Sequence, residues 1–147
     1  MALKFVTREH ARIDRIACAW LVRRFVDPDA EFLYVPKDDV SATATHEGAI
    51  PFDVPGVELG HHGEHCSFDA FIKKYDLKDP ALGALARIVR GADTSDFDAV
   101  PESAGLYAIG SGFQALSPQR FRDDHALLET QSPLYDALYE FCRGRTC

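Results

Sequence analysis

The sequence predicts an α+β domain, with a small sheet near the N-terminal half packed against several helices and a helix-rich C-terminal half. Two observations predict this class. Segments rich in β-forming residues occur only before residue 60, whereas from residue 67 onward the apolar residues recur with helical spacing. The chain has 147 residues and no internal repeat, linker or low-complexity tract, so we expect one domain over residues 1–147.

In the N-terminal half we expect two strands separated by one helix. Residues 3–6, LKFV, and 31–36, EFLYVP, have the β-branched and aromatic composition of strands. The segment 12–26 between them has the apolar period of an amphipathic helix, and Pro28 ends it. Residues 48–59, GAIPFDVPGVEL, contain two prolines and are expected to form an edge strand or a loop.

The C-terminal half is predicted to be helical throughout. The expected helices cover residues 68–75, 80–91, 102–116 and 123–142. Ser67 and Asp79 are the expected N-caps of the first two helices, and Gly91 is expected to end the second. Pro133 is expected to kink or break the last helix.

Charge and composition exclude several classes of protein. The formal net charge of −7 argues against DNA binding by this chain alone, because nucleic acids attract cationic surfaces. The N-terminus has no apolar signal region, and no apolar run approaches the roughly 18 residues of a membrane span. We therefore expect no membrane partner and a cytoplasmic location. The four cysteines form no CxxC pair, so we expect free thiols in that reducing compartment.

The segment 60–69, GHHGEHCSFD, concentrates side chains that bind metals. His61, His65, Cys66 and Asp69 offer imidazole, thiol and carboxylate groups on a loop that enters a helix. The spacing HHxxH is not by itself a known ligand pattern, so a solvated polar loop is the alternative. If the loop binds a transition metal ion, zinc or iron is expected first.

Two further groups extend this candidate site. Asp93, Asp96 and Asp98 follow the second predicted helix of the C-terminal half, where they either supply a ligand or form caps and turns. Glu64 and Cys66 are the candidates for a catalytic acid/base or redox group. Because neighbours in sequence do not make a catalytic pair, the catalytic role stays open.

Arginines gather along the first predicted helix and the residues before it. Arg8, Arg12 and Arg15 fall on one side, opposite the apolar stripe. Guanidinium groups bind oxyanions with several donors, so these three are candidates for binding chromate or a sulfate-like anion. The alternative is a solvated face balanced by neighbouring acids.

Arg24 is different, because the helical wheel places it near the centre of the apolar stripe. A buried guanidinium needs a carboxylate partner, so we expect a structural ion pair there. The candidate partners are Asp14, Asp27 and Asp93.

Several long motifs in order carry a resemblance to a known family. Residues 12–36, RIDRIACAWLVRRFVDPDAEFLYVP, match an Asp-Arg-x-Ala…Trp-Leu-x-x-Arg-Phe-x-Asp pattern. Residues 50–71 match Pro-Phe-Asp, His-x-Gly and Cys-Thr-Phe-Glu/Asp segments, and 84–93 and 135–142 extend the likeness over nearly the whole chain. With these motifs the chain resembles the bacterial chromate-resistance family, the ChrB-type domain.

The resemblance implies a cytoplasmic protein of chromate-resistance operons, either a regulator that responds to chromate or an accessory protein that handles metal. His61, Asp69 and Asp93 fall at the family's histidine and acidic positions, which implies that they are metal ligands. Two departures stand out: Arg12 and Arg90 occupy positions where the family often has histidine.

Three functions follow from these observations. The first is a metal- or oxyanion-binding accessory or sensor module of the chromate-resistance type. The second is a small metalloenzyme, redox or hydrolytic, that keeps an open coordination position. The third is a regulatory or interaction domain without metal. A chromate or sulfate-like oxyanion is the expected small partner, and a second copy of the chain, forming a homodimer, is compatible with the sequence.

Overall fold

A small parallel sheet and six α-helices make up the part of the chain that the structure describes. The structure is a computed structural model, and it describes residues 2–98 and 100–145. The α+β class expected from the sequence is confirmed. Within the described residues, no helix has both the length and the apolar character needed to cross a membrane.

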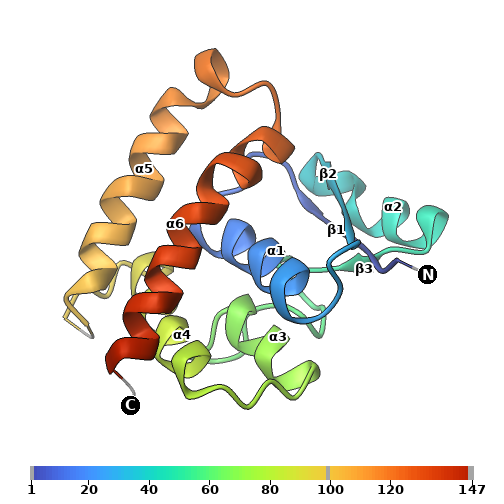
Figure 1. The fold of residues 1–147 in the computed structure, drawn as a ribbon. Coiled ribbons are helices and arrows are strands. Elements are labelled where there is room, and N and C mark those ends of the chain that lie inside the picture. Colours follow the sequence, from blue (N-terminus) through green and yellow to red (C-terminus); the bar gives the residue numbers. More distant parts are fainter. Residues whose placement is uncertain (1, 99, 146–147) are drawn as a thin grey trace.

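The fold begins with a β-α-β unit (Figure 1). It consists of β1 (Lys4–Arg8), α1 (Ile13–Phe25) and β2 (Glu31–Val35), close to the predicted ranges. β1 lies in the middle of the sheet, parallel to β2 on one edge and to the two-residue strand β3 (Ile50–Pro51) on the other. Because β1 and β3 run parallel, the residues that follow them leave the sheet at the same end, where the carboxyl ends of the strands lie.

The two faces of the sheet are covered by different elements. On one face Val6 packs with Val40, the first residue of α2 (Val40–Glu47), and with Ala49, which lies just beyond this helix. A short 3-10 helix, η1 (Lys37–Asp39), precedes α2. On the other face Phe5 belongs to the main core, where its ring lies 5.7 Å from that of Phe71. The alternation of Phe5 and Val6 on β1 thus separates the two apolar layers.

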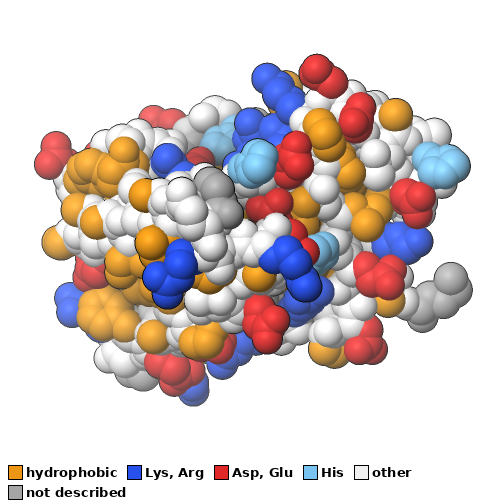
Figure 2. All heavy atoms as spheres, turned by 90° about the horizontal axis from the view of Figure 1, so that it is seen from above, with side chains coloured by type: hydrophobic (Ala, Val, Ile, Leu, Met, Phe, Trp, Pro, Cys, Tyr) orange, Lys and Arg blue, Asp and Glu red, His pale blue; other side chains and the backbone are white. Residues whose placement is uncertain are grey.

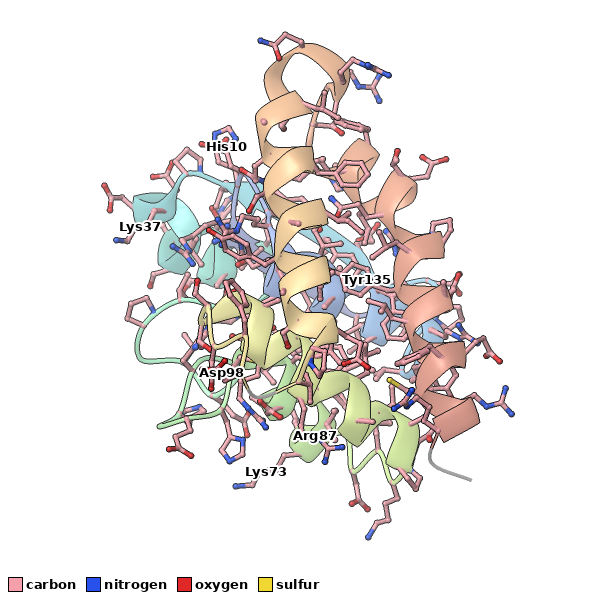
Figure 3. All side chains as sticks on the ribbon, turned by 90° about the vertical axis from the view of Figure 1, so that its left-hand side faces the viewer. His10, Lys37, Lys73, Arg87, Asp98 and Tyr135 are labelled. Atoms are coloured by element: carbon pink, nitrogen blue, oxygen red, sulfur yellow. The ribbon has the colours of Figure 1, made fainter. Side chains whose placement is uncertain are left out.

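The remaining helices surround α1 on the side away from the sheet (Figure 1). They are α3 (Ser67–Lys74), α4 (Pro80–Asp93), α5 (Glu102–Arg120) and α6 (Asp124–Arg145). Figure 3 labels Tyr135 of α6, which is fully buried and donates a hydrogen bond of 3.0 Å to the backbone carbonyl of Ile13. This bond joins the last helix to the first, and most of α1 is buried, while Arg23 and Arg24 near its end are exposed.

The segment 48–59, expected to form an edge strand or a loop, forms both: Ile50–Pro51 is the edge strand β3, and the chain turns back on itself after Phe52. One element of the first half differs from the expectation. The helix α2 is not among the expected elements, because its sequence, VSATATHE, has no apolar period and half of its residues are the weak helix formers valine, serine and threonine. Its contact with the sheet through Val40 supplies the stabilisation that its sequence lacks.

Two expectations for the second half also differ. The N-cap of α3 is Cys66 rather than Ser67, which is the first helical residue. Pro133 lies inside α6 without breaking it. Both Pro133 and Glu129, whose carbonyl loses its usual partner, are exposed, so water can satisfy that carbonyl.

Gly91 does not end its helix, because α4 continues to Asp93. A Cβ atom at Gly91 would lie 2.3 Å from Oγ of Ser103 and 2.9 Å from the backbone oxygen of Asp96. Glycine is therefore needed here for the close approach of α4 and α5, not for a turn. The expected N-cap at Asp79 is confirmed, since its side chain accepts a hydrogen bond from the backbone of Ala81.

Arg24 pairs with a different helix from the one expected. Its guanidinium contacts Asp136 and Glu140 of α6 and lies 4.7 Å from the centre of the Tyr139 ring. The expected ion pair with Asp14, Asp27 or Asp93 is wrong. The physical reason is that the apolar stripe of α1 faces α6 at this level, and α6 brings its own acids.

Candidate metal and anion site

A tight loop isolates His61 from the two histidines that follow it. A Cβ atom at Gly60 would lie 3.0 Å from the backbone carbonyl oxygen of Val54, so glycine favours the tight closure of the loop at this point. His62 and His65 then exchange two backbone hydrogen bonds of 3.0 Å around Gly63, whose φ is +63°. Because this turn leads His62 and His65 away, His61 alone enters the cluster described next.

Asp14, His61 and Asp93 converge on one point. One ligand atom from each lies within 4.8 Å of the other two. Nε2 of His61 is 3.5 Å from an oxygen of Asp14 and 3.4 Å from one of Asp93. Two ligand atoms of a tetrahedral ion, each at about 2.1 Å, are about 3.4 Å apart, so these separations suit a metal ion with three protein ligands.

The three candidate ligands come from separate parts of the fold. Asp14 lies in the first turn of α1, His61 in the loop after β3, and Asp93 at the last residue of α4. Asp14 is almost fully buried, whereas Asp93 is half-buried and His61 is the most exposed of the three. An ion in this cluster would therefore be reached from the His61 side.

The amino end of α3 orients the Asp14 carboxylate. Its two oxygens accept hydrogen bonds from the backbone N–H groups of Ser67, at 3.0 Å, and Phe68, at 3.1 Å. The positive end of the helix dipole favours a negative charge there. Because these bonds use backbone groups of a packed helix, the carboxylate is held in place before any ligand binds.

A third carboxylate, Asp53, lies beside the cluster. One of its oxygens is 3.0 Å from Nε2 of His61 and accepts a 2.8 Å hydrogen bond from the hydroxyl of Ser67. The other oxygen faces Arg8 at 3.5 Å and Arg15 at 3.9 Å. Asp53 thus connects the histidine to the arginines.

Crowding of carboxylates changes the protonation of the site. Burial, together with the charges of Asp14 and Asp53, raises the pKa of Asp93 to about 6. Burial and the charge of Asp14 also raise the pKa of Asp53. The interaction with Asp14 raises the pKa of His61 to about 9. In the metal-free protein the His61 imidazolium therefore supplies the positive charge that a bound cation would otherwise supply.

The arginines predicted to bind an oxyanion lie next to this cluster. Arg8, Arg12 and Arg15 line a cavity of about 280 Å³, whose walls also include three carboxylates, His10 and Gln114. The buried Nε atoms of Arg8 and Arg15 have no hydrogen-bond partner among the described residues. Burial and the neighbouring charge of Arg8 lower the pKa of Arg15. An anion in the cavity could accept hydrogen bonds from these Nε atoms, and its negative charge would raise the pKa of Arg15 again.

Arg12 has a contact outside the cluster as well. Its guanidinium lies 5.5 Å from the centre of the Tyr107 ring of α5. This cation–π contact holds the side chain at the rim of the cavity. All three predicted arginines are thus brought to one place by β1, α1 and the loop between them.

Asp69 lies in a different cluster. Its carboxylate accepts hydrogen bonds from Arg90, at 3.0 and 3.1 Å, and from the backbone N–H of Cys66, at 3.0 Å, and it lies 3.6 Å from His65. It is not in the group formed by His61 and Asp93, where Asp14 stands instead. In this arrangement Asp69 caps α3 and fixes the loop.

The two catalytic candidates do not reach the cluster of ligands. Cys66 is fully buried, and its thiol donates to Asp69. Burial and the charge of Asp14 raise the pKa of this thiol well above its usual value, so it stays protonated at neutral pH. Glu64 is exposed on the turn between His62 and His65.

Asp14 and Asp53 are the site residues for which the sequence alone indicated no ligand role. The sequence suggests an ion pair for Asp14, although the Asp-Arg of the first motif is a signal that could mark it as a site residue. Asp53 is the acid of the Pro-Phe-Asp motif, and its φ of +54° is unusual for a residue other than glycine. Such backbone strain often marks functional positions, but it cannot be seen in a sequence.

Comparison with known proteins agrees with the motifs. The family model described as ChrB, C-terminal domain, matches residues 5–142. Protein ChrB of Cupriavidus metallidurans is 34% identical over 137 residues, which are 92% of this chain and 40% of that protein. No solved structure matches the chain. The chain therefore belongs to the ChrB-type chromate-resistance family.

Proposed function

We propose that this chain binds a divalent transition metal ion through Asp14, His61 and Asp93, and that the ion and the neighbouring arginines together bind a small oxyanion. The observation that carries the proposal is the convergence of three ligand atoms from three separate elements within 4.8 Å of one another. Acidic groups at a protein surface are often close by chance, but here one is buried and held by two backbone hydrogen bonds.

The chemistry of the ligands narrows the choice of metal. One imidazole nitrogen and two carboxylate oxygens suit zinc or iron(II) better than a soft ion such as copper(I). Neither Cys18 nor Cys66 is expected to bind, because neither of their thiols belongs to the group of converging ligand atoms. With three protein ligands, a tetrahedral ion keeps one position open for an exogenous ligand.

The cavity next to the cluster supplies the rest of the anion site. An oxyanion bound at the open position of the metal would face Arg8, Arg12 and Arg15, which line the same cavity as Asp14 and Asp93. Guanidinium groups donate several hydrogen bonds to tetrahedral oxyanions. Membership of the chromate-resistance family supports chromate or a sulfate-like anion as the ligand.

The proposed role is an accessory or sensor module in chromate resistance, in the cytoplasm. The chain spans 40% of the curated relative, so the activity of the complete relative is not transferred to it. We propose binding rather than catalysis, because the thiol of Cys66 is protonated and buried and Glu64 lies outside the cluster.

Calorimetric titration with sulfate, a tetrahedral anion that does not oxidise thiols, tests the proposal, and chromate follows as the second ligand. We expect binding to the zinc-loaded protein and little binding to the metal-free protein. Arg8→Gln is expected to weaken binding about tenfold, the loss of one charge-assisted contact. Arg87→Gln removes the same charge from an exposed position of α4 and should have no effect. Equal affinity with and without zinc would contradict the proposal.

A further inference from the structure

The outer face of α5 carries no charge. Between Glu102 and Arg120 the helix contains no Asp, Glu, Lys or Arg, in a chain of which 27% is charged. Yet α5 lies at the outside of the molecule, and Figure 3 shows it in front of the other elements. Exposed helices of monomeric proteins normally carry charged residues on the solvent side. The composition of this face is that of a surface buried in an interface.

Large apolar side chains and a groove occupy the same surface. Ile109 and Leu116 of α5 are 45% and 43% exposed, and Phe141 of α6 is 39% exposed. The two helices are separated by an apolar groove of about 400 Å³. Its lining includes Gly105, Leu106, Ile109, Leu134, Leu138 and Phe141. Figure 2 shows hydrophobic side chains gathered at the left, the side on which α5 lies in Figure 1.

The exposed face alternates small and large residues. Gly105, Ile109, Gly112 and Leu116 follow one another at intervals of four, three and four, which places them along one stripe of the helix. A Cβ atom at Gly105 or Gly112 would meet nothing within 4 Å. Each glycine costs the helix about 1 kcal/mol relative to alanine, and no packing within the chain explains it.

We infer that the occupant of this face is a second copy of the chain, with the two α5 helices packed antiparallel across a two-fold axis that crosses the exposed stripe midway between Ile109 and Gly112. With the axis there, Gly105 faces the partner's Leu116, and Ile109 faces the partner's Gly112. Every large side chain then meets a glycine, so the stripe is complementary to itself, as a two-fold interface requires. Leu116 also enters the partner's groove at Gly105, which lines it.

The charges at the ends of α5 complement each other in the same arrangement. Glu102 is the first residue of the helix and Arg120 the last, about 27 Å away along the axis at 1.5 Å per residue. They cannot interact within one chain. Antiparallel packing brings Glu102 close to the partner's Arg120 at both ends of the interface. A second copy of the chain complements both the alternation of glycine and large residues and the charges at the two ends, whereas an unrelated surface would not be expected to complement both.

Sedimentation equilibrium over micromolar to millimolar concentrations tests the inference. The wild-type chain is expected to dimerise, and Gly112→Leu is expected to be monomeric because its side chain meets the partner's Ile109. In the monomer this substitution should stabilise the helix, since leucine is a better helix former and the space is open. Gly83→Leu makes the same change at an exposed, open position of α4 and should leave the dimer unchanged.

Charge reversal tests the orientation of the helices. Glu102→Lys and Arg120→Glu are each expected to weaken the dimer about tenfold, and the double variant should recover most of the loss. Recovery between residues at opposite ends of one helix can arise only between chains. A wild-type chain that stays monomeric at all concentrations would overturn the inference, and so would a dimer that Gly112→Leu leaves intact.

Discussion

Asp93 illustrates the energetic cost of the proposed metal site in the absence of a metal ion. Its carboxylate is half-buried near Asp14 and Asp53, and burial with these two charges raises its pKa to about 6 from 3.8. The folded state binds this proton more tightly than the unfolded state. Its contribution to stability is therefore complete below pH 3.8 and is lost as the pH rises through about 6.

Asp93→Asn is accordingly expected to stabilise the metal-free protein at neutral pH, by of the order of 1 kcal/mol, because it removes a charge that the fold disfavours. Urea denaturation above and below the pKa of about 6 measures the effect, which should shrink in acid. Asp98→Asn, at an exposed position in the same region, is the matched control. Equal changes in the free energy of unfolding for the two variants would show that the fold does not disfavour the charge of Asp93.

The protonation of His61, like that of Asp93, makes the folding stability decrease as the pH rises. Its pKa of about 9 in the folded protein exceeds the usual 6.5, so its contribution is complete below pH 6.5 and is lost as the pH approaches 9. We therefore expect the metal-free protein to become less stable between neutral pH and pH 9. His61→Ala should flatten that part of the profile, and a slope as steep as in the wild type would contradict this origin.

The residues of the candidate site were only partly predictable from the sequence. His61 and Asp93 follow from residue type and motif position, but Asp69 and Asp14 exchange the roles that the sequence suggested. Asp69 is close to His61 along the chain, and Asp14 is far from it. Proximity along the chain therefore favours Asp69, whereas hydrogen bonds from the amino end of α3 hold Asp14 next to His61 in the fold. No local pattern contains that information.

Among the elements, the contact between α4 and α5 depends on Gly91. A methyl group there would overlap with Ser103, whose Oγ lies 2.3 Å from the Cβ position and donates a hydrogen bond to the carbonyl of Ile88. Gly91→Ala is expected to lower the free energy of unfolding by about 1–3 kcal/mol, the usual cost of overpacking. Since α4 ends at Asp93, metal affinity should fall as well.

Gly83→Ala provides the comparison on the same helix. Nothing lies within 4 Å of a Cβ at Gly83, so alanine should stabilise α4 by up to about 1 kcal/mol through helix propensity alone. Thermal or urea unfolding of both variants separates packing from propensity. If Gly91→Ala were as stable as Gly83→Ala, the close approach of the two helices would be disproved.

The elements also show which patterns a sequence can reveal. The strands β1 and β2 and the helix α1 were predictable because their side chains alternate or recur with the period of the structure they form. The helix α2 was not, since VSATATHE has no such period and depends on packing against Val6. Gly91 has the residue type of a helix end but serves a helix contact, which only the tertiary structure shows.

For the whole molecule, metal binding and folding are expected to be coupled. The three proposed ligands lie in α1, in the loop after β3 and at the end of α4, so an ion would join parts of the fold that are distant in sequence. Zinc at about one hundred times its dissociation constant should stabilise the protein by about 2.7 kcal/mol. Asp93→Asn should be more stable than the wild type without zinc and gain less from it, as differential scanning calorimetry would show.

The most direct measurement is the metal content of the purified chain by plasma mass spectrometry, after reconstitution with zinc or iron(II) and removal of excess metal. We expect about one metal ion per chain for the wild type and for His62→Ala. His61→Ala, altered at the adjacent residue, should lose the ion. His62 is the suitable control because its ring contacts the carbonyl of Glu58 and not the cluster. No metal in the wild type, or equal content in all three proteins, would contradict the proposed site.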